Sequence, residues 1–133
     1  MSDKTFKALL DVELKNRADL IKVLSTYLDL EIQENLDRLL RDREEHGSIE
    51  IAEEIILPHF ESKMTESQVI IIRPNHKIKW SEKIKEVKLI IVIFLKKNET
   101  DTIKRQISQY TRKLADENYL EYLMKTETVD FNN

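Results

Sequence analysis

Residues 89–95 read LIIVIFL and residues 69–72 read VIII, two runs without a single polar side chain. A strand with one face in water alternates apolar and polar residues, whereas a strand covered by helices on both faces is apolar throughout. The two runs therefore predict central strands of a sheet that lies between helical layers. With the shorter apolar runs included, we expect strands at residues 48–52, 54–57, 68–73 and 86–95.

Helical patterns lie on either side of these strands in the sequence. Asn16 is suited to cap a first helix, and a second helix is expected to stop at Gly47, the only glycine of the chain. Asn98 with Asp101, and then Asp116, mark the starts of two more helices. The apolar positions of the four helices recur every three or four residues: Leu20, Leu24, Tyr27 and Leu28; Ile32, Leu36, Leu39 and Leu40; Ile103, Ile107, Tyr110 and Leu114; and Tyr119, Leu120, Leu123 and Met124.

The order of these elements predicts an α+β fold. A β-rich middle with helical pairs before and after it is typical of a three-layer α/β/α sandwich with a mixed central sheet. The chain has 133 residues, of which 41% are apolar and 35% charged, so we expect residues 1–133 to form one globular domain, which could be a piece excised from a longer chain.

Composition also indicates in which cellular compartment the protein is expected. No cysteine is present, so the chain has no disulfide framework and no thiolate site, which fits a reducing compartment. The N-terminal residues lack the apolar core of a signal peptide, and the run at residues 89–95 is far too short to cross a bilayer. We therefore expect a cytoplasmic domain without membrane insertion.

Charge gives little reason to expect nucleic-acid binding. The net charge is −3, with both signs interspersed along the chain. Residues 76–88 gather lysines around Trp80, but Ile78, Trp80, Ile84 and Val87 have the pattern of buried positions between solvated lysines. No direct nucleic-acid contact by this domain is expected.

Residues 48–62, SIEIAEEIILPHFES, place a Pro-His pair where an apolar pattern stops. Imidazole is neutral, nucleophilic and a competent proton acceptor near neutral pH, so a positioned histidine suits phosphoryl transfer. Pro58 fixes its own φ and holds Leu57 extended, which orients the backbone of His59. The alternative from local chemistry alone is that His59 is an ordinary turn residue.

Arg43 is the candidate cation for this site. It falls in the last turn of the second predicted helix, one turn beyond Leu39 and Leu40, where its side chain can point toward the sheet. A guanidinium there would be able to bind phosphoryl oxygens through two hydrogen bonds. The alternatives are a favourable charge at the helix C-terminus or an ion pair with Glu44 or Asp42.

The chain lacks the residue patterns that metal binding, nucleotide binding and serine hydrolysis require. His46, His59 and His76 are not spaced as zinc ligands, and cysteine is absent. A chain with one glycine has no glycine-rich phosphate loop. Ser48 and Ser62 lack the flanking motif of a serine hydrolase and read as turn residues. We expect neither a metal nor an organic cofactor.

About residues 9–128 resemble the enzyme IIA domains of the mannitol/fructose class of the bacterial phosphoenolpyruvate-dependent sugar phosphotransferase system. That family reads roughly R-E, then S-T-G-I-G-x-G-I-A-I-P-H-x-x-S. The chain matches this pattern without a gap at Arg43, Glu44, Ser48, Ile51, Ile55, Leu57, Pro58, His59 and Ser62. The resemblance implies that His59 accepts a phosphoryl group, that Arg43 helps to balance its charge, and that Ser48 and Ser62 are hydrogen-bond donors near it.

The chain also departs from the family pattern. Glu50, Ala52 and Glu54 replace the three glycines and Ile49 replaces the threonine, which predicts a more regular hairpin with a different charge. If the two glutamates faced the phosphoryl group, like-charge repulsion would oppose phosphorylation, but alternation along the strand favours a direction toward solvent. The second histidine that the family usually carries on the next-to-last helix corresponds to Ile103, so an auxiliary donor to the phosphoryl oxygens is expected to be missing.

These departures favour a regulatory variant that resembles the modules of transcriptional activators and antiterminators and is phosphorylated on His59 by the carrier protein HPr. The alternatives are a phosphocarrier that passes phosphate to a IIB domain for sugar uptake, or a degenerate interaction module that is never phosphorylated. Expected partners are HPr and either a IIB domain or regulatory domains of the same chain. An apolar docking patch around His59 is expected to include Phe60, which could equally be an ordinary partly buried residue.

Overall fold

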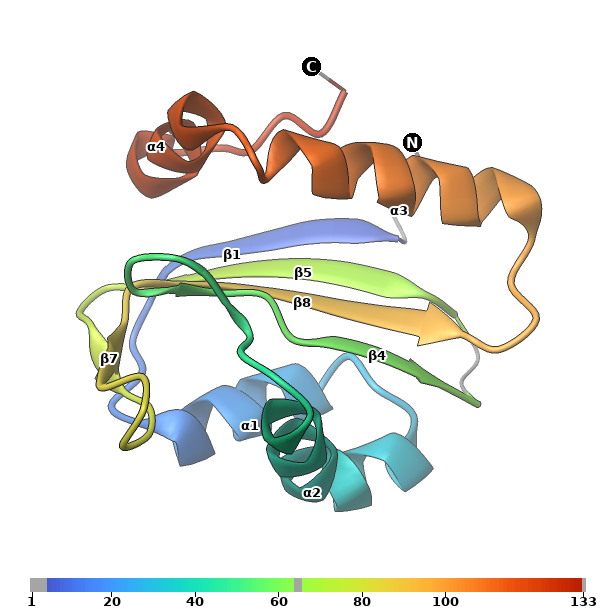
Figure 1. Cartoon of the computed structure of the whole chain (residues 1–133), viewed down its shortest axis with the longest axis horizontal. Helices are drawn as coiled ribbons and strands as arrows, with labels where there is room; N and C mark the ends of the chain where they lie inside the picture. The colour runs from blue at the N-terminus through green and yellow to red at the C-terminus, as the bar shows by residue number, and fades with distance from the viewer. Residues whose placement is uncertain (1–4, 64–65, 133) are drawn as a thin grey trace.

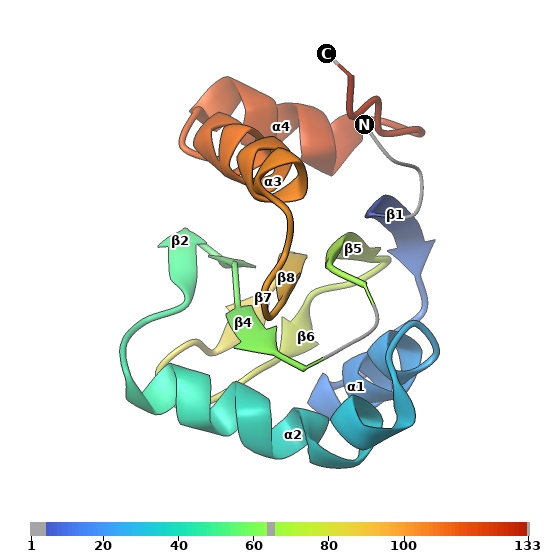
Figure 2. The ribbon, with the colours of Figure 1, turned by 90° about the vertical axis from the view of Figure 1, so that its right-hand side faces the viewer.

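The structure, a computed structural model, describes residues 5–63 and 66–132, and in them a sheet lies between two pairs of helices (Figure 1). One pair packs against each face, and Figure 2 shows the three layers from the side. The predicted α/β/α sandwich is therefore confirmed. The lower pair is α1 (Arg17–Ser25) and α2 (Leu30–Glu45), and the upper pair is α3 (Asp101–Lys113) and α4 (Glu117–Lys125).

The strands are β1 (Phe6–Val12), β2 (Glu50–Ala52), β3 (Ile55–Ile56), β4 (His59–Ser62), β5 (Gln68–Pro74), β6 (Ile78–Lys79), β7 (Glu86–Val87) and β8 (Leu89–Lys96). Within the described residues, six strands form the main sheet in the order β1-β5-β8-β3-β2, with β4 also paired to β8. β5 and β8 are antiparallel, whereas β1 is parallel to β5, and β3 and β4 are parallel to β8. The sheet is mixed, as predicted, and β6 and β7 form a separate small hairpin.

β5 and β8 are the central strands that the apolar runs predicted. Every residue of β5 is buried, and β8 is buried from Leu89 to Phe94. Because successive side chains alternate between faces, each strand supplies both cores. Ile70, Ile72, Val92 and Phe94 join the lower core with α1 and α2, and Val69, Ile71, Ile91 and Ile93 join the upper core with α3 and α4.

The helix caps follow local chemistry. The side chains of Asn16 and Asp116 accept hydrogen bonds from backbone N–H groups of their first turns, as predicted. The predicted start of α3 at Asn98 is wrong, because Thr100 is the N-cap and its hydroxyl accepts from the N–H of Ile103. Asn98 instead takes a left-handed turn conformation with φ 61°.

Two strands of the main sheet were not predicted. Residues 6–12 mix charged and apolar side chains, since β1 is an edge strand that is buried only in part. β1 precedes the first helical pair, so the helical pairs do not enclose all strands in the sequence. β4 begins at His59, where the apolar pattern had indicated the end of a strand.

The expectation of a more regular β2–β3 hairpin is wrong. Its register shifts between Glu50 and Ala52, and Glu54 has a φ of 64° although it is not glycine. Glu54 is held there by its backbone carbonyl, which accepts from the N–H of Lys88 at 2.8 Å, and by an ion pair with Lys77 at 2.7 Å. The turn keeps the conformation that glycine favours.

No helix in the described part of the chain has both the length and the apolar character needed to cross a bilayer.

Candidate functional site

Pro58 interrupts the sheet edge and sets the start of β4. Proline has no N–H to donate, and the pairing with β8 breaks between β3 and β4 at this point. The Pro58 carbonyl accepts from the N–H of Ile93 at 3.0 Å, and the N–H of Leu57 donates to Ile49 at 2.7 Å. His59 then pairs in register with Ile93. The hydrogen bonds before and after Pro58 thus fix the backbone where β4 begins.

Alternation along β4 sends neighbouring side chains to opposite faces. His59 lies opposite Ile93, whose side chain belongs to the upper core, and it faces α3 with an exposed side chain. Phe60 points into the lower core and stacks on Phe94 with ring centroids 5.4 Å apart. Of the two possibilities for Phe60, burial is confirmed and a docking role is wrong, because only 8% of this residue is exposed.

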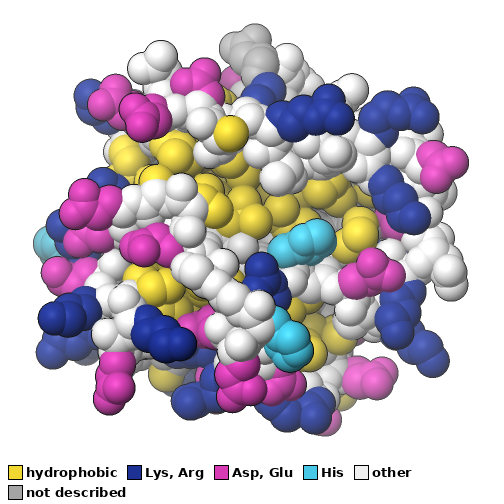
Figure 3. All heavy atoms as spheres, viewed as in Figure 1, with side chains coloured by type: hydrophobic (Ala, Val, Ile, Leu, Met, Phe, Trp, Pro, Cys, Tyr) yellow, Lys and Arg dark blue, Asp and Glu magenta, His cyan; other side chains and the backbone are white. Residues whose placement is uncertain are grey.

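A pocket of about 460 Å³ lies between β4, β8 and α3. Its apolar lining comes from Leu57, Ile93, Leu95 and Ile107, and its polar lining from His59, Lys104, Ser108, Thr111 and Arg112. Figure 3 shows apolar side chains at the bottom of a hollow on this face, with a histidine and a basic side chain beside it. The imidazole of His59 is thus accessible at the border of an apolar hollow.

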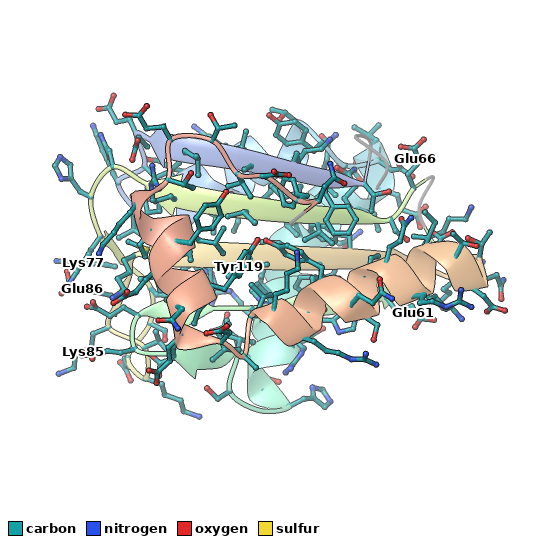
Figure 4. The ribbon with its side chains drawn as sticks, turned by 90° about the horizontal axis from the view of Figure 1, so that it is seen from above. Glu61, Glu66, Lys77, Lys85, Glu86 and Tyr119 are labelled. Carbon is teal, nitrogen blue, oxygen red and sulfur yellow. The ribbon has the colours of Figure 1, made fainter. Side chains whose placement is uncertain are left out.

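The surroundings of His59 favour the neutral imidazole. Partial burial lowers the pKa of His59, and the positive charge of Arg43 acts in the same direction. Glu61, which is labelled in Figure 4 and lies two residues beyond His59 on β4, opposes them and raises this pKa. The net shift is downward, so His59 is mainly unprotonated and nucleophilic at neutral pH.

Arg43 lies in the last turn of α2, as predicted, and is electrostatically coupled to His59. Its Nη1 donates a long hydrogen bond of 3.5 Å to the carbonyl of Gly47, and no carboxylate of the described residues forms an ion pair with it. Glu44 is engaged elsewhere, because Arg17 contacts it at 2.7 Å and Trp80 Nε1 donates to it at 3.3 Å. Arg43 is therefore near enough for its charge to act on the imidazole of His59, and within the described residues its guanidinium is largely unused.

The two serines are not brought to this pocket. Ser48 accepts a hydrogen bond from the N–H of Glu50 at 3.1 Å and lines a second cavity of about 650 Å³ at the end of α2. Ser62 is three residues beyond His59 on β4, so alternation directs it to the other face. Ile103 packs against the upper core and does not line the pocket.

Sequence reasoning missed the polar residues that α3 contributes. Lys104, Ser108 and Arg112 occupy every fourth position beside the apolar stripe of that helix, and Thr111 lies next to them. The signal was present, since residues four apart share a helix face. These residues could be related to His59 only once the direction of α3 over the sheet was known. Among the described residues, no three His, Asp or Glu side chains are grouped to hold a metal.

The comparisons with known proteins agree with this architecture. Three solved structures share the fold: nitrogen regulatory protein IIA-Ntr from Neisseria meningitidis (TM-score 0.71, 20% identity, covering 94% of this chain and 91% of that one); IIA mannitol from Escherichia coli (0.63, 19%, 99% and 95%); and a complex of IIA mannitol with phosphorylated IIB mannitol from Escherichia coli (0.62, 19%, 99% and 93%). No match was found among curated protein sequences.

The family comparison covers nearly the whole chain. Residues 5–131 match the family described as "Phosphoenolpyruvate-dependent sugar phosphotransferase system, EIIA 2". The chain therefore belongs to the EIIA type 2 family of the phosphoenolpyruvate-dependent sugar phosphotransferase system.

Proposed function

We propose that His59 accepts a phosphoryl group from the phosphohistidine of HPr and that the phosphorylated domain acts as a sugar-responsive module of a transcriptional regulator. The observation that carries the first part is the pairing of an accessible imidazole of lowered pKa with Arg43, whose guanidinium has only one long hydrogen bond within the described residues. An unprotonated nitrogen supplies the nucleophile, and a largely unused guanidinium supplies the charge that a dianion needs.

The transfer is a direct exchange between two imidazoles. A P–N bond forms at the unprotonated nitrogen of His59 as the P–N bond to the donor histidine breaks, and the electron pair of that bond stays on the donor nitrogen. Both ends of the exchange are the same chemical group, so the domain mainly supplies position and charge. Arg43 would form hydrogen bonds to the phosphoryl oxygens while the group moves.

The regulatory role is supported by the hairpin beside the site and by one structural relative. Glu50, Ala52 and Glu54 replace glycines of the family pattern, and the relative described as nitrogen regulatory protein IIA-Ntr superposes with a TM-score of 0.71. Phosphorylation adds nearly two negative charges, which is enough to alter a domain interface. In the full chain, that interface would belong to neighbouring regulatory domains.

A second candidate function is that of a phosphocarrier. IIA mannitol, which shares the fold, has been solved in complex with phosphorylated IIB mannitol. In this alternative, His59 would pass its phosphoryl group to a IIB domain. The two roles differ in the fate of the phosphoryl group once His59 carries it, so the phosphorylation itself is tested first.

The test is intact-mass measurement after incubation with phosphoenolpyruvate, enzyme I and HPr. We expect one acid-labile phosphate on the wild type and on His46→Ala and His76→Ala, which serve as matched histidine controls, and none on His59→Ala. Phosphate on His59→Ala, or none on a folded wild type beside active HPr, would overturn the proposal. Addition of IIB domains to the phosphorylated protein then separates a phosphocarrier, which loses its phosphate, from a regulatory module, which keeps it.

A further inference from the structure

One face of α3 carries a polar stripe along the His59 pocket. Lys104, Ser108 and Arg112 are four residues apart, and all three line that pocket. Four residues advance an α-helix by about 6 Å, so the stripe extends over about 12 Å with the serine in the middle. This spacing matches a small anion at the centre with one cationic side chain reaching it from each side.

The directions of the elements place His59 opposite the middle of this stripe. Figure 1 shows that α3 runs back over the sheet in the direction opposite to β8. Lys104 therefore lies toward the Leu95 end of the pocket and Arg112 toward the Leu57 end. His59 is paired with Ile93, between those two ends.

Among the described residues that line the pocket, no carboxylate balances the charges of Lys104 and Arg112. Neither Lys104 nor Arg112 forms an ion pair with any residue that the structure describes, and no carboxylate lines the pocket. Glu61 is the acidic residue whose charge reaches His59. Glu54, one of the glutamates that replace family glycines, is held by Lys77 instead. Two unpaired cations on one face favour a bound anion.

We propose that Lys104, Ser108 and Arg112 bind the phosphoryl oxygens of phosphorylated His59 and form a wall of the site opposite Arg43. The ammonium, the hydroxyl and the guanidinium each donate hydrogen bonds to those oxygens. The inference rests on the proposed phosphorylation of His59. It also changes the expectation drawn from Ile103, because α3 supplies donors from its pocket-facing stripe although that position is apolar.

The test separates the site from the partner by using two phosphoryl donors. The protein is phosphorylated either by HPr or by phosphoramidate, a small donor that needs no docking surface. Two quantities are then measured: the equilibrium constant for phosphoryl exchange with HPr, and the pKa of the phosphoryl group by ³¹P NMR. The variants are Lys104→Met, Arg112→Met and Ser108→Ala. Arg105→Met is the matched control, because Arg105 is an exposed cation of α3 outside the pocket.

We expect Lys104→Met and Arg112→Met each to shift the exchange equilibrium about three- to tenfold toward HPr, as loss of one partly exposed charge contact predicts. Both variants should raise the pKa of the phosphoryl group, because a nearby cation favours its dianion. Ser108→Ala should have a smaller effect on the equilibrium. Lys104→Arg should keep both properties close to those of the wild type, and Arg105→Met should change neither.

The exchange equilibrium and the phosphoryl pKa could prove to be the same in Lys104→Met and Arg112→Met as in the control Arg105→Met. That result would overturn this assignment, while His59 phosphorylation would stand. A wild type that takes phosphate from neither donor would overturn the proposed function, and the assignment with it. Phosphorylation by phosphoramidate alone would reject HPr as the donor, and the ³¹P titration would still decide whether the stripe binds the phosphoryl group.

Discussion

Arg73 and Arg43 have the same side chain and are used in opposite ways. The side chain of Arg73 is 7% exposed, forms two hydrogen bonds with Asp11 at 3.0 and 3.1 Å, and donates to the carbonyls of Leu123 and Thr126 at 2.8 Å each. Arg43 makes one hydrogen bond of 3.5 Å to Gly47 within the described residues. The fold occupies most of the donors of Arg73, whereas those of Arg43 remain available to an anion.

The largest effect is expected at Arg73. This guanidinium ties β5 to the end of α4, and its loss leaves the carbonyls of Leu123 and Thr126 without their donor. We expect Arg73→Met to lower the free energy of unfolding by about 3 kcal/mol, which corresponds to roughly 10 °C in melting temperature for a domain of this size. Thermal and urea unfolding would measure this loss.

The same variant tests whether the two arginines are independent. Below its melting temperature, folded Arg73→Met should be phosphorylated at the wild-type rate. A slow transfer by the folded fraction would show that Arg73 also supports the site and would break the comparison.

The opposite result is expected at Arg43. Because its donors serve no ion pair of the described fold, Arg43→Met should leave the melting temperature within about 2 °C of the wild type. Phosphoryl transfer from HPr should slow by about 10- to 100-fold, since one donor to a developing anion is lost. Rapid-quench kinetics measures the rate, and Arg41→Met, which removes a solvent-exposed arginine of the same helix, is the control. A loss of stability as large as that of Arg73→Met would assign Arg43 to the fold instead.

The ion pair between Lys77 and Glu54 concerns a smaller effect on stability than that expected at Arg73. Lys77 holds Glu54, whose φ of 64° is costly for a residue with a Cβ atom. Glu54→Gly and Glu54→Ala lose the same ion pair and differ only in how well they tolerate this φ. We therefore expect Glu54→Gly to be more stable than Glu54→Ala by about 1 kcal/mol in urea unfolding. Equal stabilities would mean that the turn relaxes out of the left-handed conformation.

The architecture was predictable from the sequence because β5 and β8 are apolar on both faces. This pattern is typical of strands that helices cover on both faces of a sheet. The sequence placed His59 after a proline and Arg43 in the last turn of a helix, but only the resemblance to the enzyme IIA pattern related the two residues, and their shared role stays a prediction. β1 was missed because an edge strand does not need a pure apolar pattern. The sequence left Phe60 open between docking and burial because the direction of its side chain depends on where β4 begins.

The pocket residues of α3 could not be predicted from the sequence, for a different reason. Lys104 and Arg112 have the pattern of ordinary solvated cations on an amphipathic helix, and nothing in their own segment relates them to His59. Their place in the pocket depends on how α3 crosses β8, which is set by core residues such as Ile107 and Ile93. A site assembled from distant segments is visible only after the packing is known.

The smallest effect concerns the protonation of His59. Its pKa is lowered first by burial and then by Arg43, while Glu61 raises it. Arg43→Met should therefore raise the pKa of His59 only part of the way to its ordinary value, and Glu61→Gln should lower it further. NMR titration of the imidazole C–H signals measures both, and Arg73→Met should leave this pKa unchanged. Shifts of the same sign in Arg43→Met and Glu61→Gln would contradict the charge arrangement.

The same pKa fixes the sign of a pH effect on stability. A histidine whose folded pKa is lowered binds fewer protons in the native state than in the unfolded state, so its contribution to stability is present above about pH 6.5. That contribution is lost as the pH falls from there through the folded pKa. His59→Gln should accordingly weaken the loss of stability on acidification, and Arg43→Met should weaken it less, because burial acts on the imidazole even without the guanidinium.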